Sequence, residues 1–251
     1  MNKTFIKKLP VVKELLAYKH FKQNEKKCQL LQKEGINSIK AYYRVGERLG
    51  IHFDVMFGTL LGVYRDHSFI PHDDDIDMVC DINFLNQQLL DVLRQEGFII
   101  ERIFVTSDKK GVQLPMKYNG LTSDIYFMYK DKTDPDIRHI FIPMAIEGKD
   151  WVYSRMLNVY SVKDMYIPYT VDRVNVPFQN DTIDIVTNAD DVLKALYGSD
   201  YMTPKANAHA NPPVRFFSLG EKYYSCYPID LFESSGILDS IKREPISSEN
   251  G

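Results

Sequence analysis

Cysteine is scarce in this sequence, with only Cys28, Cys80 and Cys226 among 251 residues. Their odd number and wide spacing exclude both a disulfide framework and the paired spacing of a structural zinc site. Long apolar runs are also missing. No stretch approaches the ~18 residues of a membrane-spanning helix. Charged residues follow the apolar pair at 11–12 too soon for a signal peptide. We therefore expect a cytoplasmic protein, because free thiols are typical of a reducing compartment.

The sequence has no excess of positive charge, because 31 lysines and arginines stand against 34 aspartates and glutamates. A net charge of −3 argues against general binding of nucleic acid. Residues 1–50 are an exception, since they are rich in lysine and arginine. Their periodicity predicts helices over 11–33 and 36–49, interrupted at Gly35. Two interpretations of this basic segment stay open: a solvated helix face, or peripheral contact with the anionic inner face of a membrane.

The remaining pattern predicts an α+β protein with a mixed sheet flanked by helices. Expected strands lie at 52–57, 75–80, 98–106, 111–118, 123–129, 138–144 and 149–154, and expected helices at 60–64, 83–96 (capped by Asn83) and 189–197. We divide the chain into the basic helical segment 1–50 packed on the core, a core at 51–204 and a helical and loop extension at 205–251. A segment rich in proline and asparagine follows Met202, and we expect the chain to fray from about Glu244.

Two aspartates, Asp75 and Asp77, alternate with apolar residues in the expected strand 75–80. At period two they project from one face of the strand, about 6–7 Å apart along it. Carboxylates this close repel each other unless a cation lies between them, and hard oxygen ligands suit Mg²⁺ or Mn²⁺. Asp124, in the strand 123–129, supplies a third acid, as a metal ligand or as the acceptor of a proton from an attacking hydroxyl. The sequence therefore predicts a metal site for phosphate chemistry.

A glycine stands ahead of these acids, at the turn between a strand and a helix. Gly58 there lets the backbone approach a phosphate closely, and the helix that follows Thr59 offers unpaired N–H groups and a favourable dipole. Arg65 adds a planar positive charge for a phosphate or for the acidic cluster. A phosphate cradle, paired acids and a third acid, in this order, are the layout of nucleotidyltransferases.

The run of aspartates also suggests a calcium-binding loop. An EF-hand counted from Asp73 has Met78 at the required glycine and Phe84 at the bidentate glutamate, so this interpretation fails. A solvated turn disagrees with the apolar residues that alternate with the paired acids. For Asp73 and Asp74 themselves two roles stay open, since either residue can form the turn or bind the metal.

The signature of the LicD family, which includes fukutin and fukutin-related protein, resembles two segments of this chain. They are residues 58–65, G-T-L-L-G-V-Y-R, and residues 69–77, F-I-P-H-D-D-D-I-D. Weaker likenesses follow, so that the resemblance covers about residues 50–204. The usual tryptophan is His72 here and a usual glycine is Ser68. Both positions border the site, so these departures bear on the identity of the donor and not on the class of reaction.

This resemblance implies a nucleotidyltransferase-like fold that uses Mg²⁺ and a CDP-activated donor. Phosphocholine, or a phospho-alditol such as ribitol or glycerol phosphate, would pass to a hydroxyl of a surface glycan, free or lipid-linked, with release of CMP. By the match, the metal-binding acids are Asp75 and Asp77, joined by Asp124. The donor contacts are then expected at Gly58, Thr59, Arg65, Lys117 and His72.

Two other functions stay open. The first is a nucleotidyltransferase proper, which transfers NMP to a sugar phosphate or another small acceptor and releases pyrophosphate. The second is a catalytically silent module that binds glycan or nucleotide. A DxD glycosyltransferase is disfavoured, because nothing ahead of Asp75 supplies repeated βαβ units.

Several further side chains have two interpretations each. His67, His72 and His209 are substrate contacts, general bases or plain loop residues. The tyrosine cluster at 223–227 is an aromatic cage for a quaternary ammonium group or ordinary packing. We interpret Trp151, the only tryptophan, as a packing residue.

Overall fold

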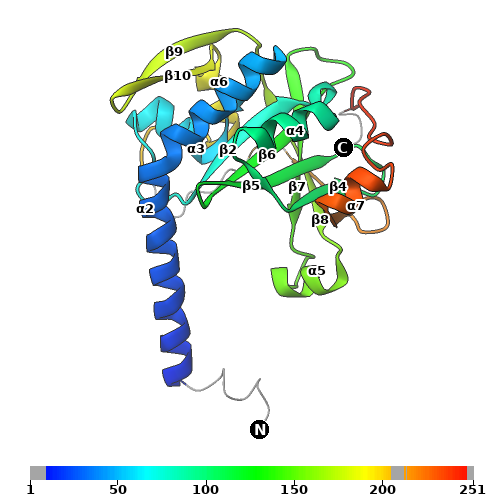
Figure 1. The fold of residues 1–251 in the computed structure, drawn as a ribbon, viewed down its shortest axis with the longest axis horizontal. Coiled ribbons are helices and arrows are strands. Elements are labelled where there is room, and N and C mark those ends of the chain that lie inside the picture. Colours follow the sequence, from blue (N-terminus) through cyan, green and yellow to red (C-terminus); the bar gives the residue numbers. More distant parts are fainter. Residues whose placement is uncertain (1–9, 205–211, 213, 248–251) are drawn as a thin grey trace.

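A computed structural model describes residues 10–204, 212 and 214–247, and for 10–20 it describes the backbone alone. The predictions for His209 and for the last four residues lie outside this part of the chain. The predicted α+β class is confirmed: a large curled mixed sheet is flanked by helices (Figure 1). None of the described helices is both long and apolar enough to cross a membrane.

Within the described residues, ten strands form the main sheet. Its strands are β1 (Asp54–Val55), β2 (Asp75–Asp81), β3 (Ile99–Ile100), β4 (Arg102–Thr106), β5 (Val112–Tyr118), β6 (Leu121–Lys130), β7 (Ile137–Met144), β8 (Ser161–Pro168), β11 (Val214–Phe217) and β12 (Tyr224–Pro228). The order is β11-β8-β7-β6-β5-β4-β12, with β2 also beside β6, β1 beside β2 and β3 beside β5. The β2–β6 pair is parallel, whereas the other pairs are antiparallel. A separate hairpin consists of β9 (Arg173–Phe178) and β10 (Asp181–Val186).

Six α-helices are described: α2 (Pro10–Leu49), α3 (Phe57–Leu61), α4 (Gln87–Gln95), α5 (Trp151–Leu157), α6 (Ala189–Tyr197) and α7 (Ile229–Ser234). A π-helical turn, Gly62–Asp66, continues α3, and a 3₁₀ turn, Ile82–Phe84, precedes α4. The C-terminal half of α2 packs on β2 and β6, where the Tyr42 hydroxyl lies 2.6 Å from Ser123 Oγ. Because side chains alternate along a strand, this helix covers the face of β6 opposite to Asp124.

The predicted interruption at Gly35 is wrong, because α2 is one continuous helix of 40 residues. Its N-terminal half extends away from the sheet in Figure 1. Gly35 serves packing: a Cβ atom there would lie 2.4 Å from Cζ of Phe69, a buried ring that packs edge-on against Phe178. Glycine is thus retained in the helix because it lets the Phe69 ring approach the backbone.

Gly35→Ala is expected to lower the free energy of unfolding by about 1–3 kcal/mol, because the packed ring must shift. Alanine's better helix propensity, about 1 kcal/mol, offsets part of this loss. Urea denaturation of Gly35→Ala, Phe69→Leu and the double variant measures the effect. We expect the sum of the two single-variant losses of unfolding free energy to exceed the loss in the double variant. Strictly additive losses would contradict the proposed contact.

Two local predictions are wrong for reasons of helix capping. Residues 149–154 were expected as a strand, but Asp150 caps α5 by accepting a hydrogen bond from the Tyr153 N–H at 2.8 Å. Helix α4 begins four residues after Asn83, because Asn86 is its N-cap and accepts from the Leu89 N–H at 2.9 Å. The expected strand 98–106 is divided into β3 and β4.

The C-terminal part of the chain joins the main sheet. Strand β11 pairs with β8 at one end, and β12 pairs with β4 at the other. The fraying expected from Glu244 does not begin there, because Ile246 exchanges backbone hydrogen bonds with Lys130 and Lys132. Residues 205–251, predicted as an extension of helix and loop, therefore also contribute edge strands.

The basic side chains of α2 partly fasten this helix to the rest of the chain. The ion pairs are Lys27 with Asp74, Lys40 with Asp181, and Arg44 with Glu96. Some of the positive charge of the basic segment is therefore explained by ion pairs within the protein, without contact with a membrane. Contact of the projecting half with a membrane stays a prediction.

Candidate active site

The structure brings the three predicted acids together on one face of the sheet. The parallel register sets Asp77 beside Asp124 and Asp75 beside Thr122. Carboxylate oxygens of the three aspartates all lie within 4.8 Å of one another. The alternation of Asp75 and Asp77 with Ile76 directs the isoleucine into the core and leaves both carboxylates on the other face.

Neighbouring side chains fix this arrangement by hydrogen bonds. The backbone N–H of Asp77 donates to Thr59 Oγ1 at 3.0 Å, which ties helix α3 to strand β2. The side-chain amide of Gln113, on β5, donates to Asp124 Oδ1 at 2.8 Å. On the opposite face, Ser123 Oγ donates to the Ile76 carbonyl at 3.1 Å. The acids are therefore held by elements from both sides of the sheet.

The acidic cluster is electrostatically unfavourable by itself. Burial, and then the charges of Asp73 and Asp124, raise the pKa of Asp75 to about 7. The pKa of Asp77 lies well above its ordinary value for the same reasons, with burial first. Burial also raises the pKa of Asp124 to about 6, although the hydrogen bond from Gln113 opposes it. A divalent cation relieves both repulsion and desolvation, so this set of oxygen ligands fits Mg²⁺ or Mn²⁺.

The two aspartates ahead of the strand have different surroundings. Asp74 forms an ion pair with Lys27 of α2 at 2.6 Å. Asp73 lies against the first turn of α3, since a Cβ atom at Gly58 would lie 2.5 Å from its Oδ2 atom. Gly58 thus makes room for a carboxylate beside the helix. A second group of carboxylate oxygens, from residues 73–75, also lies within 4.8 Å of one another.

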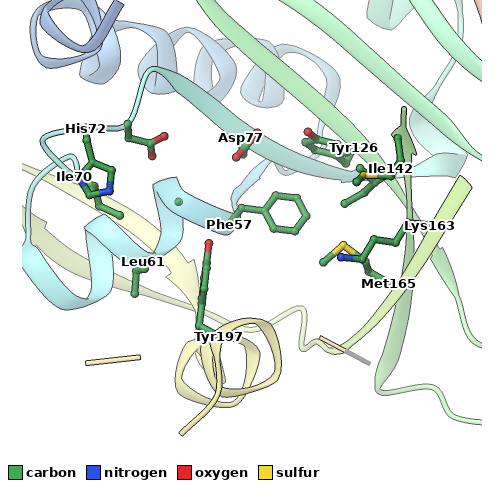
Figure 2. A pocket seen from close by; sticks show the side chains of 13 residues that line it. Phe57, Leu61, Ile70, His72, Asp77, Tyr126, Ile142, Lys163, Met165 and Tyr197 are labelled. Atoms are coloured by element: carbon green, nitrogen blue, oxygen red, sulfur yellow. The ribbon is translucent and has the colours of Figure 1, made fainter. Parts of the chain in front are cut away.

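A first cavity of about 540 Å³ opens on Asp77 (Figure 2). Its wall is formed by α3, the loop before β2, strands β6 to β8 and α6, with these lining residues: Phe57, Gly58, Leu61, Ile70, His72, Asp73, Asp77, Tyr126, Ile142, Met144, Lys163, Met165 and Tyr197. Phe57, whose ring packs edge-on on Tyr126, has a left-handed backbone with φ 49°. Such strain in an aromatic residue is typical of functional sites.

Of the five residues predicted to contact the donor, two line the first cavity and three do not. Gly58 and His72 line the first cavity. The Thr59 side chain is buried, and its hydroxyl binds β2. The guanidinium of Arg65 binds the Asp66 carboxylate through two hydrogen bonds of 2.8 and 2.7 Å, outside the cavity lining.

Lys117 also lies outside the cavity lining, and its ammonium group binds Glu101 at 3.2 Å. Sequence reasoning missed Lys163, a cation that lines the first cavity and has no ion pair among the described residues. Burial lowers its pKa. No motif marked this lysine, because strand β8 was itself not predicted.

A second cavity, of about 730 Å³, opens on Asp124. It shares Tyr126, Ile142 and Met144 with the first cavity. The acidic cluster therefore lies at the junction of two cavities, with Asp77 in the wall of the first and Asp124 in the wall of the second.

Comparison with family models gives a match to residues 50–167, described as "LicD/FKTN/FKRP, nucleotidyltransferase domain". Residues 50–167 are a LicD-family domain. The resemblance inferred from the two short motifs is thereby confirmed. A comparison with curated proteins found no match.

The matched region of the LicD domain contains the three acids, Gln113 and Lys163, and it ends within β8. At the level of the family, it suggests a transferase of the glycan phosphotransferase type. Helix α6, which supplies Tyr197 to the first cavity, lies beyond the match.

Proposed function

We propose that this protein transfers phosphocholine or a phospho-alditol, such as ribitol or glycerol phosphate, from a CDP-linked donor to a glycan hydroxyl. The reaction depends on Mg²⁺ (or Mn²⁺) and releases CMP. The observation that carries this proposal is the cluster of Asp75, Asp77 and Asp124 at the junction of two cavities. In-line transfer at phosphorus needs the attacking and leaving oxygens on opposite sides, and two cavities that flank one acidic cluster suit that requirement.

The first cavity would bind the donor. Lys163 and His72 offer a cation and a ring nitrogen to phosphate oxygens, while Gly58 lets the start of α3 approach them. Asp75 and Asp77, with Asp124, would hold the metal ion. When bound, this ion neutralises charge on the transferred phosphoryl group.

Asp124 would accept the proton of the attacking hydroxyl from the side of the second cavity. Its carboxylate lies in the wall of the second cavity, the side from which the hydroxyl would approach. The 2.8 Å hydrogen bond from Gln113 to one oxygen fixes the orientation of this carboxylate. Most of the acceleration would come from positioning and charge stabilisation.

The test is a CMP-release assay with Mg²⁺ in which CDP-choline, CDP-ribitol and CDP-glycerol are each offered with a short glycan acceptor. We expect CMP from one donor, and its loss on addition of EDTA. Pyrophosphate release from CTP or ATP with a sugar phosphate would favour the nucleotidyltransferase proper. Metal-dependent nucleotide binding without turnover of any donor would favour the silent binding module.

The location of the reaction follows from the same proposal. A lipid-linked or growing surface polysaccharide would be modified at the cytoplasmic face of a membrane. The projecting basic half of α2 would provide peripheral contact there.

A further inference from the structure

Two arginines face the second cavity without a carboxylate partner. Arg102, on β4, and Arg155, on α5, both line it. Other arginines of the described residues, such as Arg94 and Arg173, form ion pairs of 2.7 and 2.6 Å with glutamate or aspartate. No described carboxylate lies within ion-pair distance of the two cavity arginines. Glu101, which also lines the cavity, binds Lys117 instead.

The two arginines act on the same part of the cavity wall. Burial raises the pKa of Tyr160 and that of the Cys226 thiol. The charges of both guanidinium groups oppose this rise. Both arginines and the candidate general base, Asp124, line this same cavity.

An aromatic wall lies beside these charges. The Tyr160 ring lies 5.6 Å from the Trp151 ring and 5.1 Å from the Phe104 ring, between centroids, and all three residues line the cavity. Trp151 is 47 % exposed and offers part of its face to a ligand. Flat apolar rings suit the C–H faces of a sugar, and the planar guanidinium groups suit phosphate or carboxylate oxygens.

The fourth observation concerns the carboxamide of Gln113, a residue 8 % exposed that lines the same cavity. Its nitrogen donates to Asp124, while its oxygen Oε1 is buried without a hydrogen-bond partner among the described residues. An unpaired buried acceptor is costly unless a donor reaches it. A hydroxyl of a bound ligand, beside the carboxylate that takes its proton, would be such a donor.

We propose that the second cavity is the acceptor site and that it selects an anionic saccharide, whose phosphate or carboxylate group binds Arg102 and Arg155. The sugar ring lies on Trp151, and the attacking hydroxyl points at Asp124 and Gln113. The assignment of this ligand as the acceptor rests on the proposed function, whereas the anion site itself does not.

Binding of three probes to the full chain tests the site without turnover: glucose 6-phosphate, glucuronate and glucose, measured by calorimetry. We expect at least one anionic probe to bind about tenfold or more tightly than glucose, since hydrogen bonds between an anion and guanidinium groups are charge-assisted and strong. Comparison of the affinity for glucose 6-phosphate with that for glucuronate identifies the preferred anionic group. Arg102→Gln and Arg155→Gln should each weaken that binding about tenfold. Arg48→Gln removes the same charge far from either cavity lining and should leave it unchanged.

Equal binding of the three probes, or no binding of either anionic probe, overturns the proposal. Loss of CMP binding in Arg102→Gln, with sugar phosphate binding retained, would also overturn it, because the arginines would then serve the donor. The proposed function fails separately: anion binding that depends on Arg102, without CMP release from any donor, would contradict the transfer alone. Transfer to neutral and anionic acceptors with equal KM would contradict the selection alone.

Discussion

Asp77→Asn is expected to reduce transfer by about 10³-fold or more, which corresponds to about 4 kcal/mol of transition-state stabilisation. Asp77 is the member of the acidic cluster that lies in the wall of the donor cavity and in register with Asp124. Its replacement removes the negative charge of a proposed metal ligand but keeps the size of the side chain. Release of CMP under single-turnover conditions with saturating Mg²⁺ measures the loss. The same substitution at Asp75 should have a similar effect.

The folded state should tolerate this change. Because burial and the neighbouring carboxylates raise the pKa of Asp77, its ionised form destabilises the metal-free protein, and the asparagine variant should melt at a higher temperature near neutral pH. Mg²⁺ should raise the melting temperature of the parent protein and have little effect on the variant. Asp91→Asn, at an exposed position of α4, is the matched control and should keep its activity. Normal turnover in the single variants at both positions 75 and 77 would contradict the assignment.

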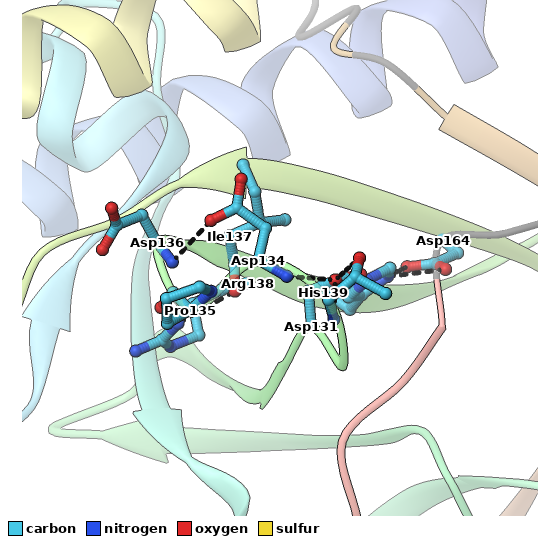
Figure 3. Close-up of polar contacts among 9 residues, drawn as sticks. Asp131, Asp134, Pro135, Asp136, Ile137, Arg138, His139 and Asp164 are labelled. Carbon is cyan, nitrogen blue, oxygen red and sulfur yellow. Dashed lines mark hydrogen bonds and ion pairs between the residues drawn. The ribbon is translucent and has the colours of Figure 1, made fainter.

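His139→Ala is expected to cost about 3–5 kcal/mol of unfolding free energy, because it removes a buried side chain that contacts the carboxylates of both Asp164 and Asp131. His139, fully buried on β7, lies between two aspartates (Figure 3). Its Nδ1 atom is 2.9 Å from Asp164 Oδ2, and its Nε2 atom is 2.9 Å from Asp131 Oδ2. Urea denaturation measures the loss. The exposed His52→Ala is the control, and we expect little change there.

This site also gives stability a pH dependence of definite sign. Burial lowers the pKa of His139, but its contacts with Asp164 and Asp131 outweigh burial and raise it above 6.5. A raised histidine pKa means that the folded protein binds the proton more tightly than the unfolded chain does. The stabilisation that protonated His139 contributes is complete below about pH 6.5. It is lost as the pH rises through the pKa of His139 in the folded protein.

The pH profile of unfolding distinguishes this charged arrangement from a neutral one. We expect the unfolding free energy to fall above pH 6.5, by at most about 1.4 kcal/mol per pH unit for one group. Asp164→Asn should move this decrease in unfolding free energy to lower pH, because it removes the carboxylate that raises the pKa of His139 most. A flat profile in the parent protein between neutral and moderately alkaline pH would contradict a protonated His139.

Local patterns in the sequence were sufficient to predict that Asp75 and Asp77 share one face of a strand. The alternation of Asp75 and Asp77 with apolar residues specifies a strand, and a strand specifies which side chains share a face. The helix through 189–197 was similarly visible, because its apolar residues recur at helical spacing. An element whose type depends on a single side-chain contact could not be predicted. Residues 149–154 were expected as a strand, but the N-cap at Asp150 begins helix α5 there.

The cavities needed the tertiary structure. Lys163, Arg102 and Arg155 lie in three different elements, and only the pairing of the curled sheet brings them near the acids. None belongs to a motif, so a single sequence offers no signal for them. Arg65 and Lys117 show the converse. Each matched the family pattern, yet neither lines a described cavity next to the acids, and each binds a carboxylate, of Asp66 and of Glu101 respectively.

The parallel pairing of β2 with β6 has a consequence for folding. The chain between Asp77 and Asp124 contains α4, β3, β4 and β5, so the two strands can meet only after this long connection has closed. Loop closure of this kind is slow, and contacts of high sequence separation form late. The three carboxylates therefore assemble only when the middle of the sheet is complete. Affinity for a divalent cation should consequently appear late in refolding, after the helices, and should report the native topology rather than helix content.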